Sequence, residues 1–130
     1  MKICIVIATR NSSYIVKCLK STKLLSVPFD LYIVDSCSTE NHYFETAEQY
    51  GTLIKNNSNY EIGAFWKAIE YISNNGSHSS YTHYMLMQDS MFFKKDLDFD
   101  LSKDNTVYAF EHFKGWEHAN EYYKRQIAID

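Results

Sequence analysis

YMLMQDSMFF, residues 84–93, is the stretch from which the fold of this chain can be inferred. Tyr84 to Met87 is short and apolar, which predicts a strand buried at the centre of a covered sheet. Asp89 follows that strand, and an isolated carboxylate is costly to bury. In open α/β sheets, ligands lie just beyond the carboxyl ends of the strands. Asp89 is therefore either a turn cap or the centre of a binding site, and we favour the binding site.

The composition limits the classes of protein that fit. The chain has 130 residues, the usual size of one domain, and a net charge of −3. A general nucleic-acid binder would present a basic face, so no nucleic-acid partner is expected. No apolar run reaches the length of a membrane span. Cys4, Cys18 and Cys37 show no metal-ligand spacing and favour a reducing compartment, hence a cytoplasmic protein.

Apolar runs and helical patterns alternate along the chain. The expected strands cover residues 3–8, 31–34, 52–55 and 82–87, with helices between them. A short return strand is expected at 91–93, a last strand at 106–110 and a last helix at 116–127. This order predicts an α/β fold with a mostly parallel sheet covered by helices on both faces. We expect one domain, residues 1–130, without repeats or linkers.

Two local patterns refine the expected helices. Gly51 suits the C-terminal end of the second helix. In the third helix the apolar residues recur at helical spacing and predict one stripe that faces the core. The members of that stripe are Ile62, Phe65, Trp66, Ile69 and Ile72.

Polar residues follow three of the expected strands. They are Thr9, Arg10 and Asn11, then Asp35 and Ser36, then Gln88, Asp89 and Ser90. In a parallel sheet these groups converge on one edge. The chain has no GxxxxGK[ST], GxGxxG, GxSxG or HExxH motif, which excludes a P-loop nucleotidase, a dinucleotide fingerprint, a nucleophile elbow and a zincin site.

Four segments together resemble the GT-A-fold glycosyltransferases, especially the inverting family 2. IVIATRN (5–11) is similar to the family's IIPTYN, and IVDSCSTE (33–40) to its VVDDGSTD. NYEIG (59–63) is similar to its N-x-G, and residues 84–93 to its strand with the metal-binding DxD. The resemblance covers residues 3–93. It implies a Rossmann-like nucleotide-diphospho-sugar transferase (GT-A) fold, with a nucleotide-binding half at about 1–93 and a short β-α tail at 94–130.

The resemblance also implies roles for matching positions. The loop from Thr9 to Asn11, including Arg10, would line the nucleotide pocket. Asp35 would sit at the base or ribose of the nucleotide, with Ser36 beside it. Gly63 would let the backbone approach the ligand, and Lys67 would approach the diphosphate.

Asp89, flanked by Gln88 and Ser90, would bind Mn²⁺ or Mg²⁺ between the two phosphates. The chain departs from the family here, because one acid stands where the family has two or more. Ser36 likewise replaces a second Asp. One carboxylate makes a weaker cation site, so the metal is expected to bind weakly or only with the nucleotide.

The catalytic base has a single candidate. GWEHANEYYKR (115–125) resembles the family's ED segment with its following helix. Glu117 would then deprotonate the acceptor hydroxyl. The alternative is that Glu117 is a first-turn acid favoured by the helix dipole.

The resemblance implies a glycosyltransferase that moves a sugar from a nucleoside diphosphate sugar, by default a UDP-sugar, to a glycan or other hydroxyl acceptor. The transfer would be inverting and assisted by a divalent cation. One alternative is a non-catalytic sugar-nucleotide-binding or assembly module. The smaller number of acidic residues at positions 36 and 88–90 favours this alternative. Another is a sugar-phosphate nucleotidyltransferase, although its Gly-rich basic loop is missing. A short domain can also leave an apolar flank for a second copy, so a homo-oligomer is a further hypothesis.

Overall fold

The computed structural model of the protein describes residues 2–40, 42–56 and 61–97. They belong to the first of two units into which the chain divides, Met1–Asp98. The strand and helix that we predicted at 106–110 and 116–127 lie outside the described residues, and so does Glu117. No helix among the described residues is long and apolar enough to cross a membrane.

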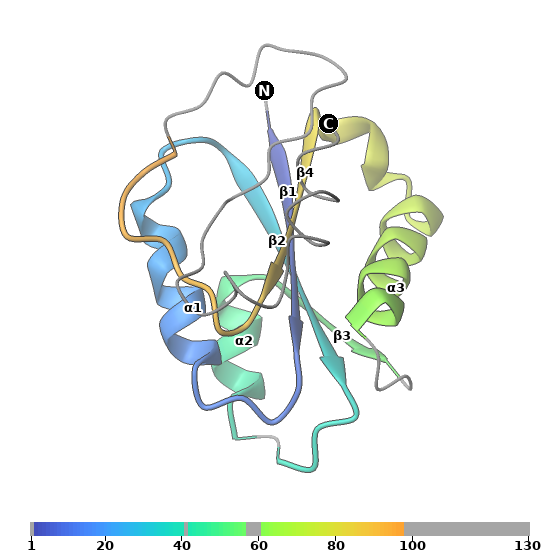
Figure 1. Ribbon diagram of the computed structural model, residues 1–130. Coiled ribbons are helices and arrows are strands. Elements are labelled where there is room, and N and C mark those ends of the chain that lie inside the picture. Colours follow the sequence, from blue (N-terminus) through green and yellow to red (C-terminus); the bar gives the residue numbers. More distant parts are fainter. Residues whose placement is uncertain (1, 41, 57–60, 98–130) are drawn as a thin grey trace, which may run out of the picture. The chain divides into compact units, whose positions relative to one another are not determined.

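Strands and helices alternate as the sequence predicts (Figure 1). The strands are β1 (Ile3–Thr9), β2 (Phe29–Ser36), β3 (Thr52–Asn56) and β4 (His83–Gln88). The helices are α1 (Ile15–Ser21), α2 (Phe44–Tyr50) and α3 (Glu61–Asn74), with short 3₁₀ turns η1 (Thr22–Leu24) and η2 (Ser77–Ser80). All described strand pairs are parallel, in the order β3-β2-β1-β4. The predicted α/β class with a parallel sheet is confirmed.

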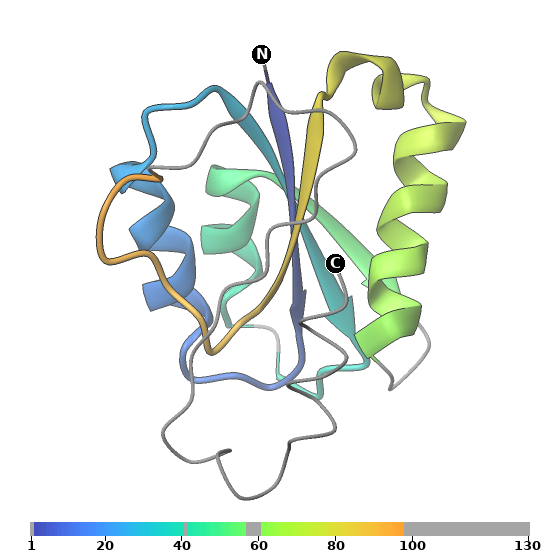
Figure 2. The same cartoon turned by 45° about the horizontal axis from the view of Figure 1, so that its top comes forward.

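Helices cover both faces of this sheet. In Figures 1 and 2, α1 and α2 lie on one side and α3 lies on the other. β1 is buried along its whole length. Because strand side chains alternate between faces, Cys4, Val6 and Ala8 join the core beneath α3. Ile3, Ile5 and Ile7 face the opposite layer and are also buried.

The face that α3 presents to the sheet differs from the predicted stripe. Ala64, Ala68 and Ile72 are buried against the sheet, with Phe65 partly buried beside them. Trp66 is 71% exposed and Ile69 is 36% exposed, so their assignment to the core is wrong. The side chain of Ile62 lies outside the described part. Two alanines four residues apart let the helix lie close to the strands, whereas a tryptophan there would hold it away.

β4 also differs from its prediction as a centrally buried strand. Within the described sheet it pairs with β1 alone. Met85 and Met87 are buried, but Tyr84 and Leu86 are exposed on the face that carries α3. One side of β4 is therefore core and the other is open in the described residues.

The segment after β4 does not form the predicted return strand at 91–93. Instead, it runs against the first helix layer. The amide of Phe93 donates to the hydroxyl of Ser21 at 2.9 Å, and the ammonium of Lys17 lies 4.2 Å from the ring centroid of Phe92. These contacts with α1 replace strand pairing in this part of the chain.

Gly51 caps the C-terminal end of α2, as the sequence predicts. Its φ of −176° is extended, so the position does not need glycine for its backbone conformation. It needs glycine for space, because an added Cβ would lie 2.1 Å from the carbonyl oxygen of Leu31. The backbone of β2 thus passes directly against the turn from α2 into β3.

We expect Gly51→Ala to lower the free energy of unfolding by about 3 kcal/mol, because a backbone carbonyl cannot move aside as a side chain can. Gly76→Ala is the matched control. Gly76 has a φ of 76° but nothing within 4 Å of an added Cβ, so only left-handed strain of about 1 kcal/mol applies. Urea unfolding of both variants measures the difference, and equal losses would contradict the steric explanation.

Candidate functional site

The carboxyl ends of β1 and β4 are joined by hydrogen bonds. The hydroxyl of Thr9 donates to Oδ2 of Asp89 at 2.8 Å, and the amide of Arg10 donates to the same oxygen at 3.3 Å. The amide of Asp89 donates to the carbonyl of Ala8 at 3.2 Å. Thr9 is buried, whereas Arg10 is exposed. The predicted meeting of these two strand ends is therefore observed.

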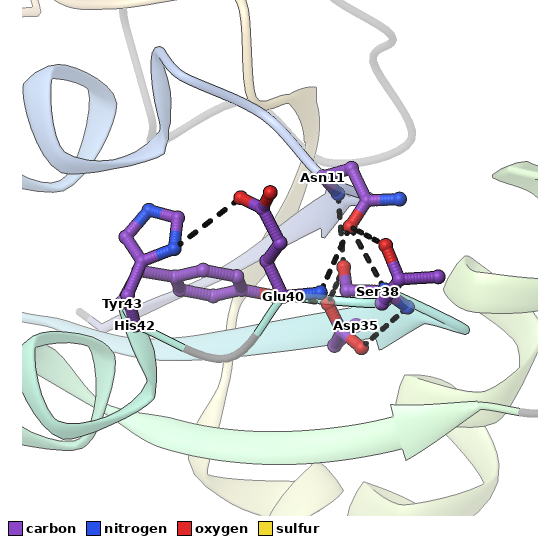
Figure 3. Close-up of polar contacts among 7 residues, drawn as sticks. Asn11, Asp35, Ser38, Glu40, His42 and Tyr43 are labelled. Atoms are coloured by element: carbon purple, nitrogen blue, oxygen red, sulfur yellow. Dashed lines mark hydrogen bonds and ion pairs between the residues drawn. The ribbon is translucent and has the colours of Figure 1, made fainter.

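A second set of bonds joins the loop after β1 to the loop after β2 (Figure 3). We call residues 10–14 the first loop and residues 37–40 the second loop. The carboxamide oxygen of Asn11 accepts from the amides of Thr39 at 2.9 Å and Glu40 at 3.3 Å. The amide of Asn11 donates to the hydroxyl of Ser38 at 2.9 Å. Asn11 has a left-handed φ of 45°, which asparagine tolerates better than most residues.

Asp35, the last residue but one of β2, is held from within the protein. The amide of Ser38 donates to its Oδ2 at 3.1 Å. The hydroxyls of Ser38 and Tyr43 both donate to its Oδ1 (Figure 3). Asp35 is 4% exposed and Tyr43 is 1% exposed. Burial, and then the hydrogen bond to Asp35, raises the pKa of Tyr43 far above its ordinary value, so the phenol remains a neutral donor.

The ends of β2 and β3 are linked beside this cluster. The amide nitrogen of Asn56 donates to the hydroxyl of Ser36 at 3.3 Å, and both residues are buried. The thiol of Cys37 donates to the carbonyl of Asn56 at 3.4 Å. Cys37 has a left-handed φ of 58° and is exposed. The polar residues predicted at the end of β2 are therefore hydrogen-bonded to Asn56 at the end of β3.

The contacts divide the predicted site residues into two sets. Bonds bring together the strand-end residues Thr9, Arg10, Asn11, Asp35 and Asp89, directly or through the second loop. Gln88 and Ser90 flank Asp89 by sequence. Gly63 and Lys67 lie on α3, which begins shortly after β3 at the same end of the sheet (Figure 1). Lys67 is exposed, and no hydrogen bond or ion pair links it to either loop within the described part.

Sequence reasoning missed several residues of this cluster. Ser38 and Thr39 lie inside the motif at 33–40, so the sequence indicated their general location. It could not predict their hydrogen bonds to Asn11. Tyr43 and Asn56 carried no signal, because a tyrosine before a helix and an asparagine after a strand are common. Their roles depend on partners that only the folded sheet brings near.

The donor set for a divalent cation is small. Among residues 2–40, 42–56 and 61–97, no group of three or more His, Cys, Asp or Glu side chains could hold a metal ion. Oδ2 of Asp89 accepts from Thr9 and Arg10, and its Oδ1 makes no hydrogen bond to a described residue. Mg²⁺ commonly takes one or two carboxylates and completes its shell with phosphate oxygens and water. A cation at Asp89 would therefore need most of its oxygen ligands from water or from a bound group.

Comparisons with solved structures place the fold. S. aureus TarS 1-349 in complex with UDP superposes with a TM-score of 0.56 at 18% identity, over 74% of this chain and 29% of that chain. A longer S. aureus TarS structure gives a TM-score of 0.51 at 18% identity, over 74% of this chain and 18% of that one. The chain thus spans less than a third of the TarS structures that it matches. No protein-family model and no curated protein matches it.

TarS is a glycosyltransferase, and the likeness at this identity is one of fold. The described residues therefore form an α/β fold with a mostly parallel sheet flanked by helices, and this fold matches that of TarS. This confirms the predicted fold class.

Substitutions of Asn11 test the hydrogen bonds that join the first loop to the second loop. Asn11→Ala should lower the free energy of unfolding by about 2 kcal/mol, because it removes the shared acceptor and leaves a residue that tolerates the left-handed region poorly. Asn11→Gly removes the same acceptor but accepts that backbone, so its loss should be about 1 kcal/mol smaller. Urea unfolding compares them, and equal losses would show that backbone strain is not part of the role of Asn11.

Proposed function

We propose that this chain is a family 2-like glycosyltransferase that takes a sugar from a nucleoside diphosphate sugar and transfers it, with inversion, to a glycan or other hydroxyl acceptor. One observation carries the proposal: on a GT-A-type fold, the first loop is bonded both to Asp89 and to the second loop. This gathers the polar ends of three parallel strands where such folds bind ligands. The UDP in the similar TarS structure supports a uridine nucleotide as the default donor.

The main requirement of this reaction is to stabilise the negative charge that develops on the departing nucleoside diphosphate. A Mn²⁺ or Mg²⁺ ion bound by Asp89 and the two phosphates would neutralise that charge. Thr9 and the amide of Arg10 hold Oδ2 of Asp89 in place, which leaves Oδ1 for the ion. The exposed side chains of Arg10 and Lys67 would add positive charge near the phosphates, and Gly63 would allow close approach of the backbone.

The acceptor half of the reaction rests on Glu117, which lies outside the described residues. We propose that its carboxylate removes the proton of the acceptor hydroxyl. The oxygen then attacks the anomeric carbon opposite the diphosphate, the bond to the diphosphate breaks, and the configuration inverts.

A non-catalytic sugar-nucleotide-binding module is the second candidate. The single acid at Asp89 and the small donor set for a metal favour it. The two candidates differ in turnover, since a module binds the nucleotide sugar and releases no product. An active transferase would slowly hydrolyse a UDP-sugar in the absence of acceptor, and Asp89→Ala would abolish this.

We expect calorimetric titration to show UDP binding that is stronger with Mn²⁺ than without it. Asp89→Asn should weaken UDP binding in Mn²⁺ at least about tenfold, because the only carboxylate proposed for the cation is lost. Asp30→Asn is the matched control, since Asp30 lies on β2 at the opposite end of the sheet, paired with Lys2 and Tyr81.

The control should leave the Mn²⁺ dependence unchanged. The proposal fails if the folded wild-type protein binds neither UDP nor GDP. It also fails in its metal part if UDP binds equally well with a chelator present.

A further inference from the structure

Asp35 has unusually little left to offer a ligand. A carboxylate accepts about four hydrogen bonds in all. Two hydroxyl groups and one amide of the protein already occupy three of those positions, and the side chain is 4% exposed. An acid that recognised the base or ribose directly would need free acceptor positions and accessible surface. The bonds of Asp35 are directed to the protein instead.

The bonds that Asp35 makes lead through one side chain to the first loop. The hydroxyl of Ser38 donates to Asp35 and accepts from the amide of Asn11 at 2.9 Å. A hydroxyl has one proton, so donation to Asp35 leaves its lone pairs for Asn11. The carboxamide oxygen of Asn11 in turn accepts hydrogen bonds from the amides of Thr39 and Glu40 (Figure 3). Each loop thus holds the other, and Asp35 fixes the orientation on which both depend.

Tyr43 is the remaining partner of Asp35 and lies behind it, just before α2. It is 1% exposed, so its ring is fixed by packing, with Phe44 in an edge contact at 4.8 Å between centroids. Its hydroxyl therefore holds Asp35 from the core side while Ser38 holds it from the loop side. At 1% exposed, Tyr43 has almost no surface that a ligand could contact.

We propose that Tyr43 is a positioning residue of the nucleotide site: it anchors Asp35, which shapes both loops and does not itself contact the nucleotide. This inference rests on the proposed function for the identity of the ligand. It predicts that Tyr43 and Asp35 affect binding of every nucleoside diphosphate alike. A residue that touched the base would discriminate between bases.

The test is Tyr43→Phe, which removes one hydroxyl and keeps the ring. UDP and GDP affinities should each fall by about fivefold in this variant, because a hydrogen bond that holds the loops is lost. Tyr32→Phe is the matched control. Tyr32 is also buried, but it faces α3 and its hydroxyl pairs with that of Tyr81 at 2.8 Å, away from both loops. The control should leave both affinities unchanged.

Asp35→Asn and the double variant complete the design. If the two residues act as one unit, the double variant should lose no more affinity than the stronger single variant, within about twofold. Two binding results would overturn the proposal. One is a Tyr43→Phe protein that melts at a lower temperature but binds both nucleotides as the wild type does. The other is an Asp35→Asn protein in which the ratio of UDP to GDP affinity changes.

Amide hydrogen exchange supplies a readout that needs no ligand. Tyr43→Phe should speed exchange at Asn11, Ser38 and Thr39, and Tyr32→Phe should not. Unchanged exchange at these amides would overturn the positioning role even if affinity falls. If the folded wild-type protein binds neither nucleotide, the proposed function fails, and the exchange data alone then decide whether Tyr43 holds the loops.

Discussion

The parallel pairing of β1 with both β2 and β4 is the constraint on which this site depends. Thr9 pairs with Asp35 across one side of β1, and Ala8 pairs with Gln88 across the other. The three strands therefore end at nearly the same level, and the polar residues at their carboxyl ends meet. The buried faces of β1 fix this register, because a shift by one residue would exchange the side chains of the two faces. The hydrophobic core thus determines where the polar groups of the site lie.

Those polar groups then hold one another. Thr9, Asp35, Ser36 and Asn56 are buried at the ends of the strands, where a lone polar group would be costly. Each has a partner inside the protein. A cluster satisfied in this way is ordered before any ligand arrives, which lowers the entropy cost of binding. The exposed side chains around this cluster include those of Arg10, Thr39 and Glu40.

The sequence was informative where a pattern reflects a local cause. Short apolar runs at residues 3–8 and 31–34 predicted β1 and β2, and the convergence of Thr9, Asp35 and Asp89 was expected from strand direction alone. It failed where packing chooses between neighbours. Periodicity located α3 but could not tell that alanines, which carry little hydrophobic signal, would face the sheet in place of Trp66. Tyr43 escaped notice because its role depends on Asp35, eight residues earlier, being turned inward.

This chain has fewer acidic residues at the strand ends than the family pattern that it resembles, and this affects how it would bind a diphosphate. A second carboxylate at position 36 or 90 would repel the ligand unless a cation lay between them. With serine at position 90 and glutamine at position 88, Asp89 has no acidic neighbour on either side, and it is half-buried. The positive charge of Arg10 is then less fully offset. Under the proposed function, the balance between metal and protein cations would move toward the protein, and nucleotide affinity would depend on ionic strength as well as on Mn²⁺.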